Sequence, residues 1–172
     1  MHQDLSELAQ RLGRWMAEQC TDGLRGLFGD EIAEQFPDEH RRSLGVALAE
    51  LEAEGMVTLS HLIGSKLPRV RTTVELFVAC DAAITGNDPV EDSVILARML
   101  IENPDLGGRA SDLEEATGWE RRRFNPAFAL VIPNIADGRV RKVIQNDYPS
   151  MGVLIAGGDL VQLRQYVQRH SS

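Results

Sequence analysis

The spacing of apolar side chains predicts three helices at the start of the chain. The first has an apolar face whose members recur at steps of three and four residues: Leu5, Leu8, Leu12, Trp15 and Met16. These side chains place a helix over about residues 4–20. A short helix is expected over residues 31–36, between a capping aspartate and a proline. A third is expected over residues 38–54.

The pattern changes after the third helix and predicts a β-hairpin. Gly55 is well placed to end the helix, because glycine adopts the left-handed conformation found there. Residues 56–62 and 69–72 are expected to form two strands around a turn-rich segment. Thr72 and Glu75 have capping-box spacing, which favours a fourth helix over residues 74–84. A strand continuing through residue 78 is the competing interpretation, since β-branched positions also alternate there.

The second half of the chain repeats the first half at an offset of 83 residues. The repeat aligns Gly55 with Gly138 and Val70 with Val153 without a gap. The expected elements are listed in chain order: helices over residues 90–102, 111–118 and 125–135, strands over 139–145 and 153–156, and a helix capped by Asp159. Residues 85–89 read as a linker, so we predict two domains, residues 1–86 and 87–172.

Composition narrows the class of protein. The 172 residues carry a net charge of −8, which lowers the expectation of nonspecific nucleic-acid binding. Two cysteines, far apart in apolar helical patterns, read as reduced core thiols. No apolar run approaches the length of a membrane span, and the first twelve residues do not resemble a signal peptide. A cytoplasmic protein without a membrane partner is therefore expected.

Motifs for catalysis are missing from the sequence. Four histidines are scattered, and none has metal-ligand spacing with a cysteine or an acid. The Gly107-Gly108 and Gly157-Gly158 pairs lack the residues of a phosphate-binding loop. We expect neither a catalytic site, a metal site nor a cofactor, and predict that the protein is not an enzyme.

Basic residues cluster at the start of each third helix and in each hairpin. In the second half, three arginines precede Asn125 and Pro126, which read as a helix N-cap and first turn. Six basic residues and one acid lie between residues 121 and 142. The candidate contacts for nucleic acid or another anion are Arg41, Arg42, Lys66, Arg69, Arg121, Arg122, Arg123, Arg139, Arg141 and Lys142. A solvated, flexible turn is an equally weighted interpretation of the arginine run.

Residues 127–132 are apolar on every side, which is unlike a helix that reads bases. Such a helix is covered by the other domain, by a second copy or by a partner protein. Tyr148 is expected to be exposed at the tip of the second hairpin. The candidate residues for a protein interface are therefore Phe128, Val131 and Tyr148.

The order helix, short helix, helix, hairpin and closing helix occurs twice and resembles the winged helix-turn-helix superfamily. The resemblance covers nearly the whole chain and rests on element order rather than on a motif. It implies a mainly α fold with small β-hairpins (α+β), built as tandem winged-helix domains. Many members bind nucleic acid through the third helix and the hairpin, and others bind proteins there.

Two functions follow from these patterns. The first is a non-enzymatic adaptor or assembly protein that binds a protein partner or itself, within a DNA-associated complex. Its acidic balance, size and layout are similar to those of the accessory subunits that clamp the linker of chromosome-condensing ATPases. The alternative is a DNA-binding transcriptional regulator that uses the third helix and hairpin of each unit.

Overall fold

The computed structural model describes residues 5–61, 64, 67–141 and 147–171, and it divides into two compact units. The first unit consists of Met1–Thr21 and Arg25–Gly86, and the second of Asp22–Leu24 and Asn87–Ser172. Both are mainly helical and carry a small antiparallel sheet, which is an α+β architecture.

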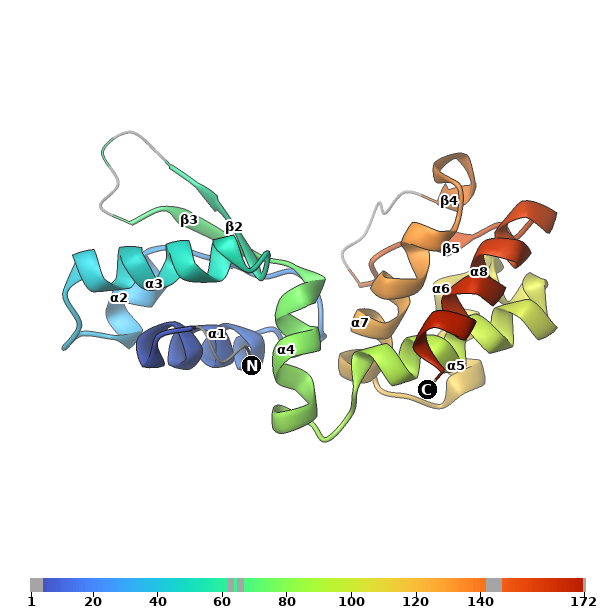
Figure 1. Ribbon diagram of the computed structural model, residues 1–172, viewed down its shortest axis with the longest axis horizontal. Coiled ribbons are helices and arrows are strands. Elements are labelled where there is room, and N and C mark those ends of the chain that lie inside the picture. Colours follow the sequence, from blue (N-terminus) through green and yellow to red (C-terminus); the bar gives the residue numbers. More distant parts are fainter. Residues whose placement is uncertain (1–4, 62–63, 65–66, 142–146, 172) are drawn as a thin grey trace. The chain divides into compact units, whose positions relative to one another are not determined.

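The first unit has four helices and a three-stranded sheet among its described residues (Figure 1). In chain order the elements are α1 (Glu7–Gln19), β1 (Leu27–Phe28), α2 (Asp30–Gln35), α3 (Arg41–Ala53), β2 (Val57–Ser60), β3 (Arg69–Thr72) and α4 (Val74–Ile84). The sheet order is β1-β3-β2, so the strand before the short helix pairs with the returning strand of the hairpin. The expected second strand and fourth helix of this half are confirmed, and the competing continuous strand is wrong.

Gly55 ends α3 as its position predicts. Its φ of +71° lies in the left-handed region, where a residue with a Cβ is disfavoured. The amide of Met56 donates to the carbonyl of Leu51 at 2.9 Å, and the amide of Gly55 donates to Glu52. These bonds satisfy carbonyls that a helix end would otherwise leave unpaired, and they turn the chain into β2.

The sheet covers the core of the first unit with one face. Phe28, Val57 and Val70 alternate with outward residues and are buried among the apolar side chains of α1, α3 and α4. Thr72 is also inward, and its hydroxyl accepts the Gly26 amide at 2.7 Å. The expected capping box is therefore not formed, because this hydroxyl is used by the β1 segment and Thr73 precedes α4 instead.

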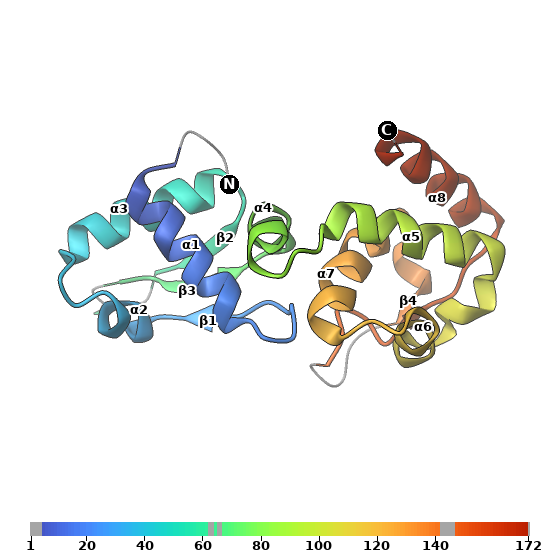
Figure 2. The same ribbon diagram turned by 90° about the horizontal axis from the view of Figure 1, so that it is seen from below.

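The second unit is arranged around α5, which packs against both α7 and α8 (Figures 1 and 2). In chain order the elements are α5 (Pro89–Glu102), η1 (Pro104–Gly108), α6 (Ala110–Thr117), α7 (Arg121–Val131), η2 (Ile132–Asn134), η3 (Asp137–Arg139), β4 (Val140–Arg141), β5 (Gly152–Val153) and α8 (Gly157–His170). The two strands are antiparallel, with Val140 opposite Val153. Val153 is buried in this core as Val70, 83 residues earlier, is in the first, but Val70 lies opposite Leu59, whereas Val153 lies opposite the counterpart of Val57.

Among the described residues of the second unit there is no third strand, and the 3₁₀ turn η1 packs against β5. The amide of Ala110 donates to the carbonyl of Met151 at 2.9 Å. Gly152 has a φ of +155°, and a Cβ there would lie 2.5 Å from the carbonyl oxygen of Gly108. The close approach of two backbones therefore requires glycine at this point of the sheet.

Three expectations for the second unit need correction. Helix α7 begins at Arg121, so Asn125 is a fully buried residue within the helix and not its cap, and Pro126 lies inside it. Gly138 belongs to the turn η3 and lacks the left-handed conformation of Gly55. Asp159 is the third residue of α8, which Ala156 precedes.

Candidate functional site

The arginine run of the second unit occupies the first turn of α7, where the helix dipole disfavours positive charge. Arg123 is held by the carboxylate of Asp92 on α5, with hydrogen bonds of 2.8 Å from Nε and 2.6 Å from Nη2. The Asp92 side chain is only 5% exposed. The guanidinium also lies over the ring of Trp119, 4.1 Å from its centroid. The hydrogen bond to Asp92 raises the pKa of Arg123 further, so the guanidinium stays charged while it pairs with this carboxylate.

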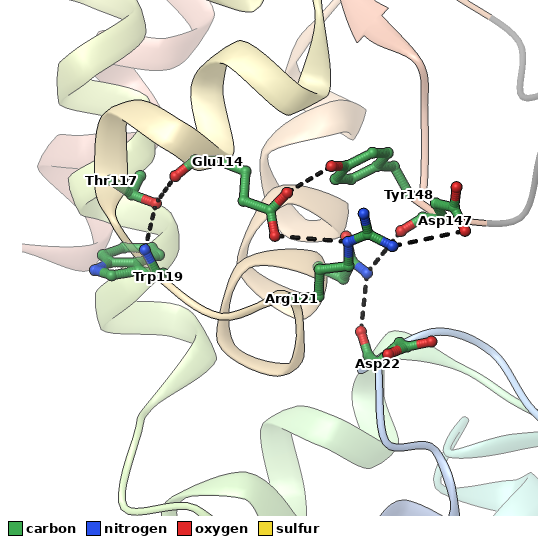
Figure 3. Close-up of polar contacts among 8 residues, drawn as sticks. Asp22, Glu114, Thr117, Trp119, Arg121, Asp147 and Tyr148 are labelled. Atoms are coloured by element: carbon green, nitrogen blue, oxygen red, sulfur yellow. Dashed lines mark hydrogen bonds and ion pairs between the residues drawn. The ribbon is translucent and has the colours of Figure 1, made fainter.

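Arg121 joins the start of α7 to the segment that connects β4 with β5 (Figure 3). Its guanidinium lies 3.7 Å from the carboxylate of Glu114 on α6, 3.6 Å from that of Asp147, and over the ring of Tyr148. The Tyr148 hydroxyl donates to the same Glu114 carboxylate. Burial and the Glu114 charge raise the pKa of Tyr148, which keeps the phenol protonated as a donor.

Arg139 also forms an ion pair within this unit. Its Nε and Nη2 donate to the two carboxylate oxygens of Asp159 at 2.6 and 2.7 Å. Asp159 also accepts the backbone amides of Ala136 and Ala156. The hydrogen bond from Arg139, assisted by these amides and opposed by burial, lowers the pKa of Asp159 to about 2.

The remaining cations of the expected strip are dispersed. Arg122 is half-buried in the first turn of α7. Arg141 is exposed and donates to the carbonyl of Gly108 at 2.8 Å. Lys142 lies outside the described residues. The structure brings the helix start and the hairpin together, but it brings carboxylates with them, so the strip is a mixed-charge network.

The first unit presents its arginines differently. Arg41 and Arg42 are exposed in the first turn of α3, and Arg69 and Arg71 are exposed on β3. Within the described part of the chain, none of these four side chains forms an ion pair. Lys66 lies outside the described residues. Four exposed arginines without an ion pair among the described residues therefore lie on the first unit, where the sequence pattern was weaker.

The expected protein interface on the second unit is wrong for two of its three residues. Phe128 and Val131 are fully buried in the unit's own core, because α7 packs against α5 over its length. Tyr148 is half-buried rather than exposed, with its ring edge-on to Phe124 at 6.0 Å. These side chains hold the second unit together, and Phe128 and Val131 are closed to a partner in the folded state.

Exposed apolar side chains occur elsewhere. Val46, on the outward side of α3, is 55% exposed, and its helical position indicates this from sequence. Leu27 is 46% exposed on β1, a strand that the sequence pattern does not predict. Met151 and Leu154 beside β5 are also exposed. The only sequence feature that indicates this strand is the pair Leu27-Phe28, in which one side chain faces outward and the next faces inward. Two residues are too few to distinguish a strand from a loop.

The described residues contain neither a cluster of metal-ligand side chains nor a helix suited to span a membrane. No group of three or more histidine, cysteine, aspartate or glutamate side chains is arranged there to hold a metal ion. None of the helices in the same residues combines the length and apolar character that crossing a bilayer needs.

Comparison with known proteins yields no match. No protein-family model, no curated protein and no solved structure is similar to this chain at a significant level.

Proposed function

We propose that this chain is a non-enzymatic adaptor, built from two winged-helix-like units, that binds a protein partner. The observation that carries the proposal is the pairing of the second unit's arginines with its own carboxylates. Arg121, Arg123 and Arg139 each contact an aspartate or glutamate of the same unit. Three arginines of the densest cationic segment therefore pair with carboxylates of their own unit, which lowers the positive charge available to phosphates.

The outward side of α3 in the first unit supports the same proposal. Beyond its first turn, this side carries Val46 and Ala49, both exposed. A helix that reads bases carries arginine, lysine, asparagine, glutamine or serine at such positions. Farther along, Glu50 and Glu52 accept the backbone amides of Ser6 and Leu59, so their charges are fixed near this helix. Small apolar groups flanked by acids suit a protein surface better than a nucleic-acid backbone.

Site-specific photocrosslinking in cells that produce the protein would test the proposal. A photoreactive phenylalanine analogue at Val46 is expected to yield a discrete adduct with one protein. The same analogue at Gln162, exposed on α8 of the second unit, is the matched control and should yield none. An adduct with nucleic acid at Val46, or no adduct from either position, would contradict the adaptor.

DNA binding by the first unit is the second candidate, favoured by its four exposed arginines without ion pairs. A labelled duplex titrated at low salt should then bind with an affinity that falls steeply as salt increases. The Arg41→Ala/Arg42→Ala variant would weaken that binding, and Arg109→Ala/Arg164→Ala, at exposed positions of the second unit, would not. The adaptor proposal expects no duplex binding under the same conditions.

A further inference from the structure

The outward face of the first unit's sheet has a composition unlike the rest of the unit. Its described positions are Leu27 on β1, Thr58 and Ser60 on β2, and Arg69 and Arg71 on β3. All five are exposed, while the residues between them face the core or are half-buried. We refer to these five residues as the sheet face.

Strand register places these side chains side by side. Leu27 and Thr58 both lie opposite Arg71, on either side of it, and Ser60 lies opposite Arg69. Directly opposed residues of antiparallel strands have Cβ atoms about 5 Å apart, and positions two residues apart on one strand point to the same side. The sheet face therefore combines two guanidinium groups, two hydroxyls and one aliphatic side chain on one surface.

Charge on the sheet face opposes the charge of its surroundings. Up to residue 86 the chain has 8 basic and 14 acidic residues. The described strand positions on this face carry two arginines and no carboxylate. Both arginines lack an ion pair within the described part of the chain, although acids outnumber bases in this unit. A planar guanidinium without an internal partner is suited to bind a carboxylate from another molecule through two hydrogen bonds.

From this arrangement we propose that the sheet face binds an acidic segment of a protein partner that also carries an aliphatic side chain. The carboxylates pair with Arg69 and Arg71, and the aliphatic group packs on Leu27, which is 46% exposed beside Arg71. The Ser60 hydroxyl is placed to hydrogen-bond the backbone of that segment, whereas the Thr58 hydroxyl donates to the carbonyl of Arg71 at 3.5 Å.

A protein segment fits this face better than a nucleic acid for two reasons. A phosphate backbone offers no apolar group to cover Leu27. The free energy gained by burying that side chain would therefore be lost. The negative field of the unit repels a long polyanion more strongly than a short segment with a few carboxylates. The inference rests on the proposed adaptor function and names the partner chemistry of one surface.

Peptide selection on the full chain tests the inference. A random-peptide display library is selected against the immobilised protein, and recovered peptides are measured by fluorescence anisotropy. We expect recovered peptides to combine aspartate or glutamate with leucine, isoleucine or valine. Arg69→Glu/Arg71→Glu should weaken their binding roughly tenfold or more, because like charges then face each other. Arg109→Glu/Arg164→Glu, with the same charge change on exposed residues of the second unit, should leave binding unchanged.

A second variant separates the apolar contact from the charges. Leu27→Asp should also weaken the binding of the peptides. Circular dichroism and thermal melting should show that each variant remains folded. The inference is overturned if acidic peptides are not enriched, or if both charge-reversed pairs weaken binding equally. It is also overturned if a labelled DNA duplex, and no peptide, loses binding on Arg69→Glu/Arg71→Glu.

The outcome is separable from that of the adaptor proposal. If photocrosslinking at Val46 captures a protein while the sheet-face variants change nothing, the adaptor function stands and this inference fails. If the peptides bind the sheet face but Val46 yields a nucleic-acid adduct, the adaptor proposal fails by itself.

Discussion

Arg139 and Asp159 form a bidentate ion pair, with hydrogen bonds of 2.6 and 2.7 Å, that joins η3 to the first turn of α8. The carboxylate is 3% exposed and also accepts the amides of Ala136 and Ala156. One side chain thereby fixes the residues before β4, the start of α8 and the segment that follows β5. An exposed pair of arginine and aspartate would contribute little to the free energy of unfolding. This pair should contribute more, because its carboxylate is buried and also accepts hydrogen bonds from backbone amides.

Acid should destabilise the second unit through Asp159. Its pKa is lowered from 3.8 to about 2 in the folded state, so its contribution is complete above pH 3.8 and is lost as the pH falls towards 2. The contribution at neutral pH is about 2 kcal/mol. Asp159→Asn should lower the free energy of unfolding by a comparable amount at pH 7 and by less near pH 2.

Urea unfolding followed through one tryptophan in each unit gives the measurement. The two tryptophans are Trp15 and Trp119, so Trp15→Phe leaves a reporter for the second unit alone. Asp137→Asn, which removes an exposed carboxylate from η3, is the matched control and should have little effect. If both variants lose the same free energy of unfolding at pH 7, the bidentate pair does not contribute the stability assigned to it.

Asp92→Asn should destabilise the second unit by about 3 kcal/mol, because it leaves the guanidinium of Arg123 without its buried partner. The exposed pair of Arg14 and Glu18 on α1 is the comparison, and Glu18→Gln should cost no more than about 0.5 kcal/mol. Trp119 fluorescence should follow the first variant and Trp15 fluorescence the second. Similar costs for the two pairs would contradict the internal role of Arg123.

Phe128→Ala should destabilise the second unit by about 3–5 kcal/mol, because Phe128 is fully buried and its removal leaves a cavity. Val46→Ala, at an exposed site of similar apolar character, should change stability by less than about 0.5 kcal/mol. Urea unfolding with the same tryptophan reporters measures both. If Phe128→Ala leaves the free energy of unfolding nearly unchanged and abolishes partner binding, Phe128 belongs to the interface that the sequence predicts.

Gly152→Ala should be strongly destabilising, since the new Cβ would lie 2.5 Å from the Gly108 carbonyl and the φ of +155° is unfavourable to other residues. Gly158→Ala, in the first turn of α8, meets no atom within 4 Å and should be neutral or stabilising by up to about 1 kcal/mol. Thermal melting of both variants distinguishes backbone contact from a general effect of replacing glycine.

Local pattern was sufficient for much of the fold. The predicted strand over residues 69–72 and helix over residues 74–84 agree with β3 and α4, and Gly55 ends α3. These features depend on side chains within a few residues of one another. Strand β1 was missed because two residues carry no periodic signal, and only pairing with β3 makes them a strand.

The start of α7 shows where local reasoning failed. Asn125-Pro126 resembles a helix start, yet the helix begins four residues earlier at Arg121. Three arginines in a first turn are unfavourable by themselves. Arg121 is compensated by Glu114 and Asp147, and Arg123 by Asp92, which is 31 residues away. Such partners are not visible in a window of sequence, so the arginine run was interpreted as either an anion site or a solvated, flexible turn.

By itself, the sequence determined most of the helices and the strand over residues 69–72, because periodic burial and turn chemistry act over a few neighbours. Only the tertiary structure decided which charges are free. Arginines 121, 123 and 139 are paired within the second unit, whereas Arg69 and Arg71 extend from the outward side of a sheet. The physical reason is that an ion pair forms only where the fold brings a carboxylate close to the guanidinium. All arginine side chains have the same chemistry, so only their neighbours in the fold distinguish them.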